Sequence, residues 1–292
     1  MITLRSILSR ASKEGWAVPH FNASDFEQFR GICEAAAKLR APIMLGTSEG
    51  ERNFIGLNAA VALVGALRKE FHIPLFLNAD HTKSVAAAKK AIDAGYDSVH
   101  IDLSRQPWKK NLEGTREVVR YAKKKNRTVQ IEGELGYMVT ESSQIYKKKI
   151  VVDPHTFTNP GQAKRFVAQT GINRFAPAVG NLHGIAANRP RLDFTLIKEL
   201  REILPSKITL VLHGGSGNSP TAFKKAIKAG ISNIHISTEL RMAYAQGLKT
   251  SQRTLKNELA PYKLAAPVVE AVRKKAEYFI KLFGAINRVG SK

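Results

Sequence analysis

The sequence predicts an α/β fold, a closed (β/α)8 TIM barrel with an additional C-terminal helix. Short apolar runs rich in β-branched residues alternate with longer amphipathic runs, and eight such pairs follow one another along the chain. The length of 292 residues suits a barrel, which takes about 250 residues as one domain. Strict alternation of strand and helix favours a parallel sheet, and eight units favour closure; a doubly wound open sheet is the alternative.

The predicted elements follow in order along the chain. The strands are expected at Ala17–Asn22, Pro42–Gly46, Pro74–Leu77, Ser98–Asp102, Thr128–Glu134, Arg174–Val179, Thr209–Leu212 and Asn233–Ile236. The helices that follow them are expected at Asp25–Leu39, Leu57–Phe71, Ser84–Ala94, Leu112–Lys125, Pro160–Gln169, Phe194–Leu204, Pro220–Ala229 and Glu239–Leu248. Ser24, Ser84 and Ser219 are suited to cap helix starts, and Gly95, Gly171 and Gly230 stand just past helix ends.

Both ends of the chain carry a further helical pattern. The segment Met1–Arg10 contains Arg and Ser and no acidic residue before Glu14, as transit peptides do. A short opening helix is favoured, because the first strand follows at once without a linker. The tail contains one strong helical pattern, Pro267–Phe283. We therefore expect residues 1–292 to form one barrel domain with a helical extension at about 250–292.

Composition is typical of a globular cytoplasmic protein. Hydrophobic residues make up 43% of the chain, enough for a sizeable core. No apolar run reaches the roughly 18 residues that a membrane span needs. The single cysteine, Cys33, excludes an intrachain disulfide and suits a reducing cytosol. Its helical spacing from Phe29 and Ala36 predicts a small core residue rather than a catalytic thiol.

The formal net charge of +22 is unusually high. A basic surface attracts nucleic acid, anionic membranes or anionic substrates. The lysines are spread along the chain without interleaved aromatic residues. A diffusely basic surface is therefore favoured over a nucleic-acid site, and attraction of a phosphorylated substrate needs only part of that field.

Three histidines stand where predicted strands end. His81 follows the third strand, His183 follows the sixth and His213 follows the seventh. In a barrel these ends meet at one face, where active sites of this fold lie. Three neutral imidazole nitrogens that leave one coordination position open suit a catalytic Zn²⁺. Carboxylates at the ends of strands three, four and five converge on the same rim.

Glycines beside these histidines predict an anion site. Gly184, Gly214 and Gly215 expose backbone N–H groups, and Ser216 adds a hydroxyl close to a helix that begins near Pro220. A backbone nest next to a helix N-terminus binds phosphate, and barrels commonly hold phosphate at the loops after strands seven and eight.

Asp80 directly precedes one of the expected metal ligands. If a turn at the strand end brings both side chains to the site, Asp80 is placed to act as a general base. The alternative is a carboxylate that only orients a histidine. The residues alone leave these two roles equally open.

Taken together, these motifs make the chain resemble the class II fructose-bisphosphate and tagatose-bisphosphate aldolases. The resemblance runs from about Ala17 to the C-terminal helix, and it depends on the motifs in combination. The matching segments are Val18-Pro-His-Phe-Asn22, Leu45-Gly-Thr-Ser-Glu-Gly50, Ala79-Asp-His81, Glu132-Gly-Glu-Leu-Gly136, His183-Gly184, Leu212-His-Gly-Gly-Ser-Gly217 and Ile236-Ser-Thr-Glu-Leu240.

The resemblance implies metal-dependent, reversible aldol cleavage of a ketose 1,6-bisphosphate to dihydroxyacetone phosphate and glyceraldehyde 3-phosphate. By the resemblance, the catalytic zinc would be bound by His81, His183 and His213. A second divalent position would be formed by Asp102 and Glu134. Asp80 would handle the proton of the substrate C4 hydroxyl. Matched to the phosphate and the rest of the sugar are Gly184, Gly214, Ser216, Ser237, Thr238, Asn22 and Ser48. A monovalent cation near the phosphate, and a homodimer or homotetramer, also follow from the resemblance.

Two positions depart from the family pattern. The loop after the fifth strand usually carries an acid that moves the proton on the dihydroxyacetone carbon, and Ser142 stands in its place. The adjacent Glu141 is a candidate substitute. The family usually has Asn at the end of the eighth strand, where this chain has His235. His235 is expected to contact phosphate, block the pocket or join the metal shell.

Three hypotheses follow from these residues. The first is an active ketose-bisphosphate aldolase, and the sequence does not distinguish fructose from tagatose as its sugar. The second is a homologue that keeps metal and phosphate binding but has lost efficient catalysis, as a non-catalytic subunit or sensor. The third is a protein whose main partner is nucleic acid, and it is the least favoured.

Overall fold

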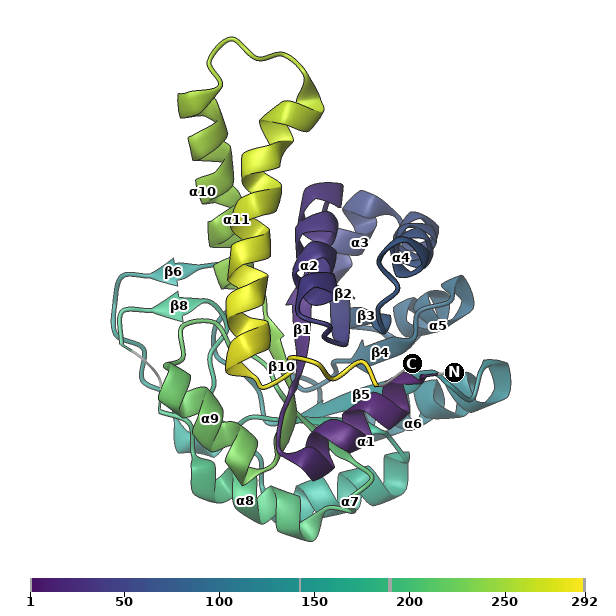
Figure 1. Cartoon of the computed structure of the whole chain (residues 1–292). Coiled ribbons are helices and arrows are strands. Elements are labelled where there is room, and N and C mark those ends of the chain that lie inside the picture. Colours follow the sequence, from purple (N-terminus) through teal and green to yellow (C-terminus); the bar gives the residue numbers. More distant parts are fainter. Residues whose placement is uncertain (1, 142, 189–190, 291–292) are drawn as a thin grey trace.

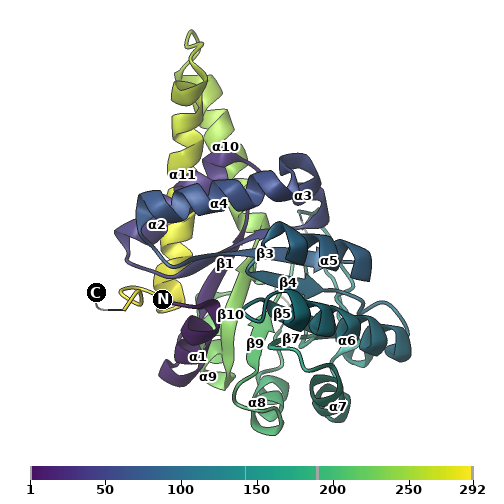
Figure 2. The same cartoon turned by 90° about the vertical axis from the view of Figure 1, so that its right-hand side faces the viewer.

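The computed structural model describes residues 2–141, 143–188 and 191–290, and parallel strands close into a barrel. The order around the barrel is β1, β10, β9, β7, β5, β4, β3 and β2, with helices outside (Figure 1 and Figure 2). These strands are β1 Val18–Asn22, β2 Ile43–Thr47, β3 Leu75–Thr82, β4 Ser98–Ile101, β5 Gln130–Leu135, β7 Arg174–Pro177, β9 Thr209–Leu212 and β10 Ile231–Ile236. The closed barrel predicted from the sequence is confirmed, and the doubly wound sheet is excluded.

Helices surround the barrel and alternate with its strands. They are α1 Leu4–Glu14, α2 Phe26–Lys38, α3 Glu49–Ile55, α4 Leu57–Phe71, α5 Val85–Ala94, α6 Trp108–Lys125, α7 Pro160–Thr170, α8 Phe194–Ile203, α9 Pro220–Ala229, α10 Thr238–Thr254 and α11 Pro261–Leu282. Two short strands, β6 Ile145–Tyr146 and β8 Ile185–Ala186, pair with each other outside the barrel. The 3-10 turn η1 Pro154–Thr156 lies in the loop after β6.

The predicted residues at helix starts and ends are confirmed except for Ser24, because the neighbouring Asp25 caps α2 instead. The Ser84 hydroxyl accepts a hydrogen bond from the backbone of α5, and the Ser219 hydroxyl does the same for α9. Gly95 and Gly171 both end their helices with positive φ, at 102° and 71°. The local sequence is therefore sufficient to specify where these helices begin and end.

The sequence missed or misplaced several helical boundaries. The short helix α3, which Ser48 and Glu51 cap, was not predicted, because seven residues give too little periodicity to recognise. The opening helix is confirmed, but it runs four residues further than Arg10, to Glu14. In the tail, α10 continues to Thr254, and α11 begins at Pro261 rather than Pro267. Both prolines suit a helix start, and the first one takes that position.

The helices α10 and α11 pack side by side and project beyond the barrel as a pair (Figure 1). Two glycines make this packing close. A Cβ atom on Gly247 of α10 would lie 2.6 Å from Cα of Val268, and one on Gly31 of α2 would lie 2.6 Å from the carbonyl oxygen of Val269. The C-terminal extension is therefore a helical pair anchored on α2. Among the helices of residues 2–141, 143–188 and 191–290, none combines the length and the apolar character that a membrane span requires.

Charged side chains occupy the centre of the barrel. The strands are buried on both faces, as parallel strands usually are. The layer between strands and helices is apolar, with the ring of Phe166 on α7 packed near that of Phe175 on β7. Inside the barrel, Arg174, Glu132 and His100 are each 0% exposed. Buried charges of this kind must be paired with one another, and this pairing shapes the site above them.

Candidate active site

The end of β3 breaks the usual alternation of side chains. His81 has a positive φ of 42°, and the register of β3 with β4 shifts between Ala79 and Thr82. As a result, both Asp80 and His81 line the same cavity. The turn that the sequence required for a joint role of these two neighbours is present.

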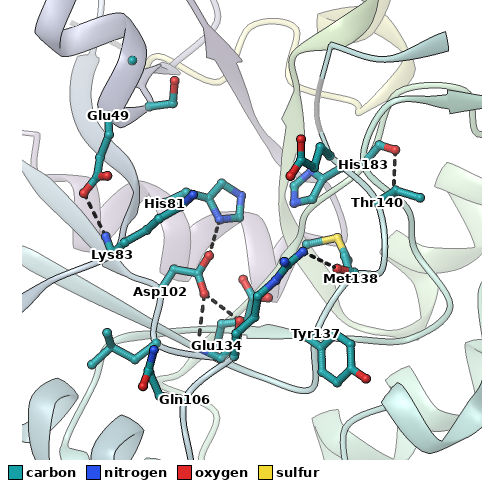
Figure 3. Close-up of a pocket in the computed structure, with 16 residues that line it drawn as sticks. Glu49, His81, Lys83, Asp102, Gln106, Glu134, Tyr137, Met138, Thr140 and His183 are labelled. Carbon is teal, nitrogen blue, oxygen red and sulfur yellow. Dashed lines mark hydrogen bonds and ion pairs between the residues drawn. The ribbon is translucent and has the colours of Figure 1, made fainter.

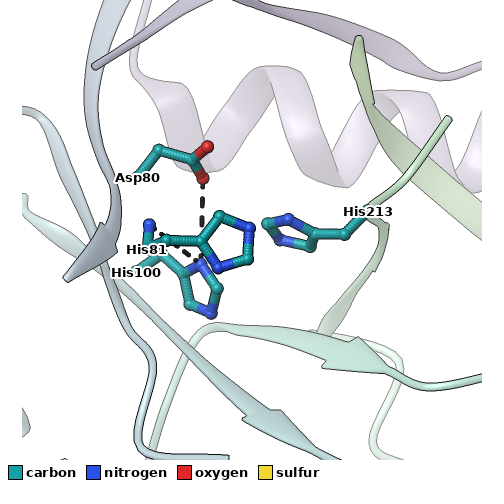
Figure 4. Close-up of side chains that lie close together, drawn as sticks. All are labelled: Asp80, His81, His100 and His213. Atoms are coloured by element: carbon teal, nitrogen blue, oxygen red, sulfur yellow. Dashed lines mark hydrogen bonds and ion pairs between the residues drawn. The ribbon is translucent and has the colours of Figure 1, made fainter. Parts of the chain in front are cut away.

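The three histidines predicted to bind metal lie around one point. The ring centroid of His81 is 4.8 Å from that of His183 and 4.6 Å from that of His213, and the last two are 6.3 Å apart. A nitrogen-bound ion lies about 3.2 Å from each ring centroid, so two rings on one ion lie at most about 6.4 Å apart. The distance between the centroids of His183 and His213 is close to that limit. Tetrahedral coordination of one ion would bring these two rings about 1 Å closer together. Figure 4 shows the rings of His81 and His213 next to each other.

Carboxylates fix which nitrogen of each ring is free. Nδ1 of His81 lies 2.8 Å from Oδ2 of Asp102, and Nε2 of His213 lies 2.5 Å from Oε1 of Glu132. Because a carboxylate accepts, these nitrogens carry the hydrogens, and Nε2 of His81 and Nδ1 of His213 keep their lone pairs. Nε2 of His81 is buried without a hydrogen-bond partner. This is the donor set that Zn²⁺ takes.

The pKa shifts of His183 and His213 agree with neutral metal ligands. At His81 burial lowers the pKa, but Asp80 and Asp102 outweigh it and raise the pKa. Loss of water contact, together with the charge of His81, lowers the pKa of His183 to about 3. Burial also holds the pKa of His213 well below its usual value. Burial raises the pKa of the Asp102 carboxyl, but the hydrogen bond from His81 outweighs burial, and the net effect lowers this pKa.

A second group of possible ligands lies beside the first. Ligand atoms of His81, His100, Asp102 and Glu134 lie within 4.8 Å of one another. Nε2 of His100 is 3.3 Å from Oε2 of Glu134, and both atoms are buried without a hydrogen bond. A further group within the same limit contains Asp80, His81, His100 and His213, whereas His183 belongs to neither. These unpartnered atoms fit a divalent cation near His81.

A hydrogen bond holds one carboxylate oxygen of Asp80, and His235 lies beside the other. The amide of Asn22 donates to Oδ2 at 3.0 Å, and Nδ1 of His235 lies 3.3 Å from Oδ1. Burial raises the pKa of Asp80, but the neighbouring His81 and His235 outweigh it and keep the pKa well below the usual value. The carboxylate that orients His81 is Asp102, which leaves Asp80 free for the other role that the sequence allowed.

Glycine loops form a small cavity of about 40 Å³ next to Asp80. Its lining includes the predicted phosphate-binding positions Asn22, Ser48, Gly184, Gly214, Gly215, Ser216, His235, Ser237 and Thr238. Gly214 has a φ of 61°, and a Cβ there would lie 2.1 Å from the carbonyl oxygen of Leu182. The hydroxyl of Ser237 is buried without a partner, where α10 begins. Backbone N–H groups and a helix N-terminus thus border a confined anion-sized space.

A larger cavity of about 470 Å³ opens on the other side of His81 and His183 (Figure 3). Asp102, Glu134 and Glu141 line it as well. The Thr140 hydroxyl donates to the backbone carbonyl of His183 at 2.9 Å, so the loop after β5 contacts the histidine loop directly. Ser142 lies outside the described residues.

The sequence missed several residues that support this site. His20, Glu132 and Arg174 fill the barrel beneath it, and Arg241 lines the small cavity while it pairs with Glu51. The sequence signal that could have identified them is a histidine or arginine in the middle of an otherwise apolar strand. His235 stacks on His20, with ring centroids 3.5 Å apart and planes 3° from parallel.

Together, the closed parallel barrel and the imidazoles and carboxylates at the carboxyl ends of its strands define a (β/α)8 enzyme with a metal-ligating mouth. Residues 2–288 match the family model described as fructose-bisphosphate aldolase class-II. The fructose-bisphosphate aldolases of Staphylococcus aureus and Staphylococcus epidermidis are each 34% identical over 99% of both chains. The chain belongs to the class II fructose-bisphosphate aldolase family.

Solved structures agree with this assignment. The YdjI aldolase from Escherichia coli K12 superposes with a TM-score of 0.83 and 27% identity over 99% of both chains. A fructose-bisphosphate aldolase from Campylobacter jejuni shares the fold at 20% identity, with a TM-score of 0.83. This chain is therefore a carbon–carbon lyase that cleaves a ketose bisphosphate in the metal-dependent manner of its family.

Proposed function

We propose that the substrate is fructose or tagatose 1,6-bisphosphate, cleaved between C3 and C4 to dihydroxyacetone phosphate and glyceraldehyde 3-phosphate. The observation that carries this proposal is the convergence of His81, His183 and His213 beside Asp80 and a glycine-lined cavity. A metal site, a base and an anion site within one barrel mouth are what an aldol cleavage of a phosphorylated ketose needs.

His81, His183 and His213 would hold the catalytic Zn²⁺. When bound there, Zn²⁺ polarises the C2 carbonyl of the substrate. Asp102 and Glu134 are the candidates for a second divalent position, which the unpartnered oxygen of Glu134 supports. A monovalent cation would lie near the phosphate loops.

Asp80 would accept the proton of the C4 hydroxyl. As that proton leaves, the C4–O bond becomes the aldehyde carbonyl, the C3–C4 bond breaks, and its electron pair remains on C3 next to the C2 carbonyl. A pKa well below the usual value keeps Asp80 ionised, so a lone pair is free for the proton, and it also makes this carboxylate a weak base. A proton must then reach C3, and Glu141, which lines the larger cavity, is our candidate for that transfer.

The cavity beside Asp80 would bind the phosphate of the dihydroxyacetone half. Its backbone and hydroxyl donors are Gly184, Gly214, Gly215, Ser216, Ser237 and Thr238, and His235 lies in the same lining. Asn22 and Ser48 would lie along the rest of the sugar. The net charge of +22 would favour approach of a doubly phosphorylated substrate.

We also infer that residues 1–292 act as one domain, in the cytoplasm, as a homodimer or homotetramer. The single buried cysteine is consistent with a reducing compartment. Nucleic acid is not proposed as a partner, because the lysines are spread along the chain rather than gathered in one segment.

The test is cleavage of each bisphosphate by the purified protein before and after exhaustive chelation, with Asp80→Asn as the matched variant. We expect cleavage that chelation abolishes and Zn²⁺ restores, and a loss of roughly 10²- to 10⁴-fold in Asp80→Asn. Activity that survives full metal removal would contradict the metal-dependent reaction. Bound Zn²⁺ and phosphate without cleavage of either sugar would favour a non-catalytic homologue.

A further inference from the structure

Arg174 is the hub of the polar network inside the barrel. Its guanidinium lies 2.7 Å from Oε2 of Glu132 and 2.6 Å from the hydroxyl of Ser98. It also contacts Oδ1 of Asn233 at 2.5 Å, Oδ1 of Asn78 at 3.3 Å and Nε2 of His235 at 3.2 Å. The side chain is 0% exposed, so protein atoms supply its surroundings.

This network determines where the hydrogen of His235 lies. A guanidinium has donors only, so Nε2 of His235, 3.2 Å from Arg174, accepts from it through its lone pair. The same nitrogen lies 3.3 Å from Oδ1 of Asn233, but that oxygen already accepts from Arg174 at 2.5 Å. In a neutral ring the hydrogen is then on Nδ1, which lies 3.3 Å from Oδ1 of Asp80. Burial, together with the charge of His213, lowers the pKa of His235 to about 3, which keeps the ring neutral.

The same reasoning applies to His20 through one intermediate. Oδ1 of Asn78 faces Arg174, so its amide nitrogen faces Nε2 of His20 and donates to it at 3.0 Å. The hydrogen of His20 is therefore also on Nδ1. The two rings stack with centroids 3.5 Å apart, so His20 supports the plane of His235 against rotation.

We propose that Arg174 and His235 are positioning residues for Asp80: Arg174 fixes the His235 tautomer, and the Nδ1–H of His235 holds Oδ1 of the Asp80 carboxylate. This inference rests on the proposed role of Asp80 as the base. Oδ2 accepts from Asn22, and Oδ1 lies 3.3 Å from Nδ1 of His235. Neither Oδ1 nor this Nδ1 has a hydrogen-bond partner in the structure, so a small rotation of either group would join them and fix the carboxylate toward the cavity. A fixed carboxylate presents its remaining lone pairs to the substrate hydroxyl in one orientation.

The cluster of His20, Asp80 and His235 is not itself a metal site. One ligand atom from each lies within 4.8 Å of the others, and all three side chains are buried. The lone pair of an imidazole nitrogen lies in the plane of the ring, and these rings are stacked with planes 3° from parallel and centroids 3.5 Å apart. An ion in the plane of one ring is therefore well outside the plane of the other. The stack suits a positioning role rather than coordination.

The tautomer can be read directly in the folded enzyme. Long-range ¹H–¹⁵N spectra of protein labelled on histidine nitrogens distinguish the two neutral tautomers from each other and from the imidazolium. The signal of His235 is assigned as the one that disappears in His235→Asn. We expect the Nδ1–H form of His235 at neutral pH, with and without added Zn²⁺. The Nε2–H form, or an imidazolium, would overturn the proposal.

Turnover separates positioning from a purely structural role. His235→Leu fills similar space without a donor, and we expect kcat for bisphosphate cleavage to fall roughly 10- to 100-fold with KM little changed. In His235→Asn the amide nitrogen takes the place of Nδ1, and it should recover most of the turnover lost in His235→Leu. Equal losses in both variants, no loss in either, or a change in KM alone would overturn the proposal.

Arg174 is tested through the spectrum of its partner. Arg174→Lys keeps the charge beside Glu132 but cannot donate to all five partners, so His235 should show a mixture of tautomers. An unchanged Nδ1–H signal in the folded variant would remove Arg174 from the proposal. If Arg174→Lys does not fold, the spectra and kinetics of the His235 variants still decide the proposal. If the wild-type enzyme cleaves neither sugar, the proposed function fails, whereas the spectrum still reports the tautomer.

Discussion

The Cβ atom that Gly46 lacks would lie 2.1 Å from Cε1 of His20, so the glycine leaves the space that the imidazole occupies. Gly46 on β2 pairs with Asn22 on β1, two residues beyond His20. Its φ is not in the left-handed region, so the requirement is for space rather than for backbone conformation. Glycine on one strand and histidine on the next therefore form a matched pair inside the barrel.

The first prediction concerns this pair. We expect Gly46→Ala to lower the free energy of unfolding by about 1–3 kcal/mol, because the methyl group must displace a buried ring. Adding His20→Ala should remove the clash, so the double-mutant cycle should show a coupling of about 0.5–3 kcal/mol. Urea denaturation measures both. Gly65→Ala, where an added Cβ meets nothing within 4 Å, is the control. Equal effects of Gly46→Ala and Gly65→Ala would contradict the prediction.

The rim of the barrel was predictable from the sequence because it follows from topology. In a closed parallel barrel the carboxyl ends of the strands meet, so His81, His183 and His213 needed only correct strand ends to be brought together. The glycine loops beside them were predictable for the same reason. Even the joint placement of Asp80 and His81 required only a turn, which the positive φ of His81 supplies.

The interior beneath the rim was not predictable in this way. His20, Arg174 and His235 come from β1, β7 and β10, and their contacts depend on register between strands far apart in sequence. A one-residue change in register would turn each side chain to the opposite face. The prediction of the C-terminal helix start was wrong for another reason. Pro261 and Pro267 are equally suited to begin a helix, and the local pattern does not distinguish them.

The second prediction concerns the histidine with the loosest geometry. We expect His183→Ala to lose bound Zn²⁺ after dialysis and to lose cleavage with it, because the two remaining imidazoles leave the ion incompletely coordinated. His155→Ala is the matched control, since His155 is exposed on η1 and lines neither cavity. Metal content by atomic absorption gives the result. Full retention of Zn²⁺ by His183→Ala would exclude His183 from the metal site.

The third prediction tests the loop that departs from the family pattern. We expect Glu141→Ala to lower kcat by roughly 10²- to 10⁴-fold if this carboxylate moves the proton at C3. The same change should slow exchange of the C3 proton of dihydroxyacetone phosphate with solvent, which isolates that step from bond cleavage. Glu202→Ala, which removes a surface carboxylate near Lys198, is the control. Unchanged exchange in Glu141→Ala would mean that another group carries the proton.

The fourth prediction uses the buried thiol of Cys33, which is 0% exposed on α2 and whose pKa burial raises to about 12. The unfolded thiol ionises near pH 8.5, so between about pH 9 and 12 the folded chain binds more protons than the unfolded chain. Stability attributable to Cys33 is therefore complete below this range and declines as pH rises through it.

Relative to Cys33→Ala, the wild type should lose roughly 2–3 kcal/mol of unfolding free energy between pH 8 and 10.5 in urea unfolding. At pH 8 the folded thiol should resist iodoacetamide until denaturant is added. A wild-type-to-variant difference that stays constant with pH, or rapid alkylation of the folded enzyme, would show that the thiol is accessible to water.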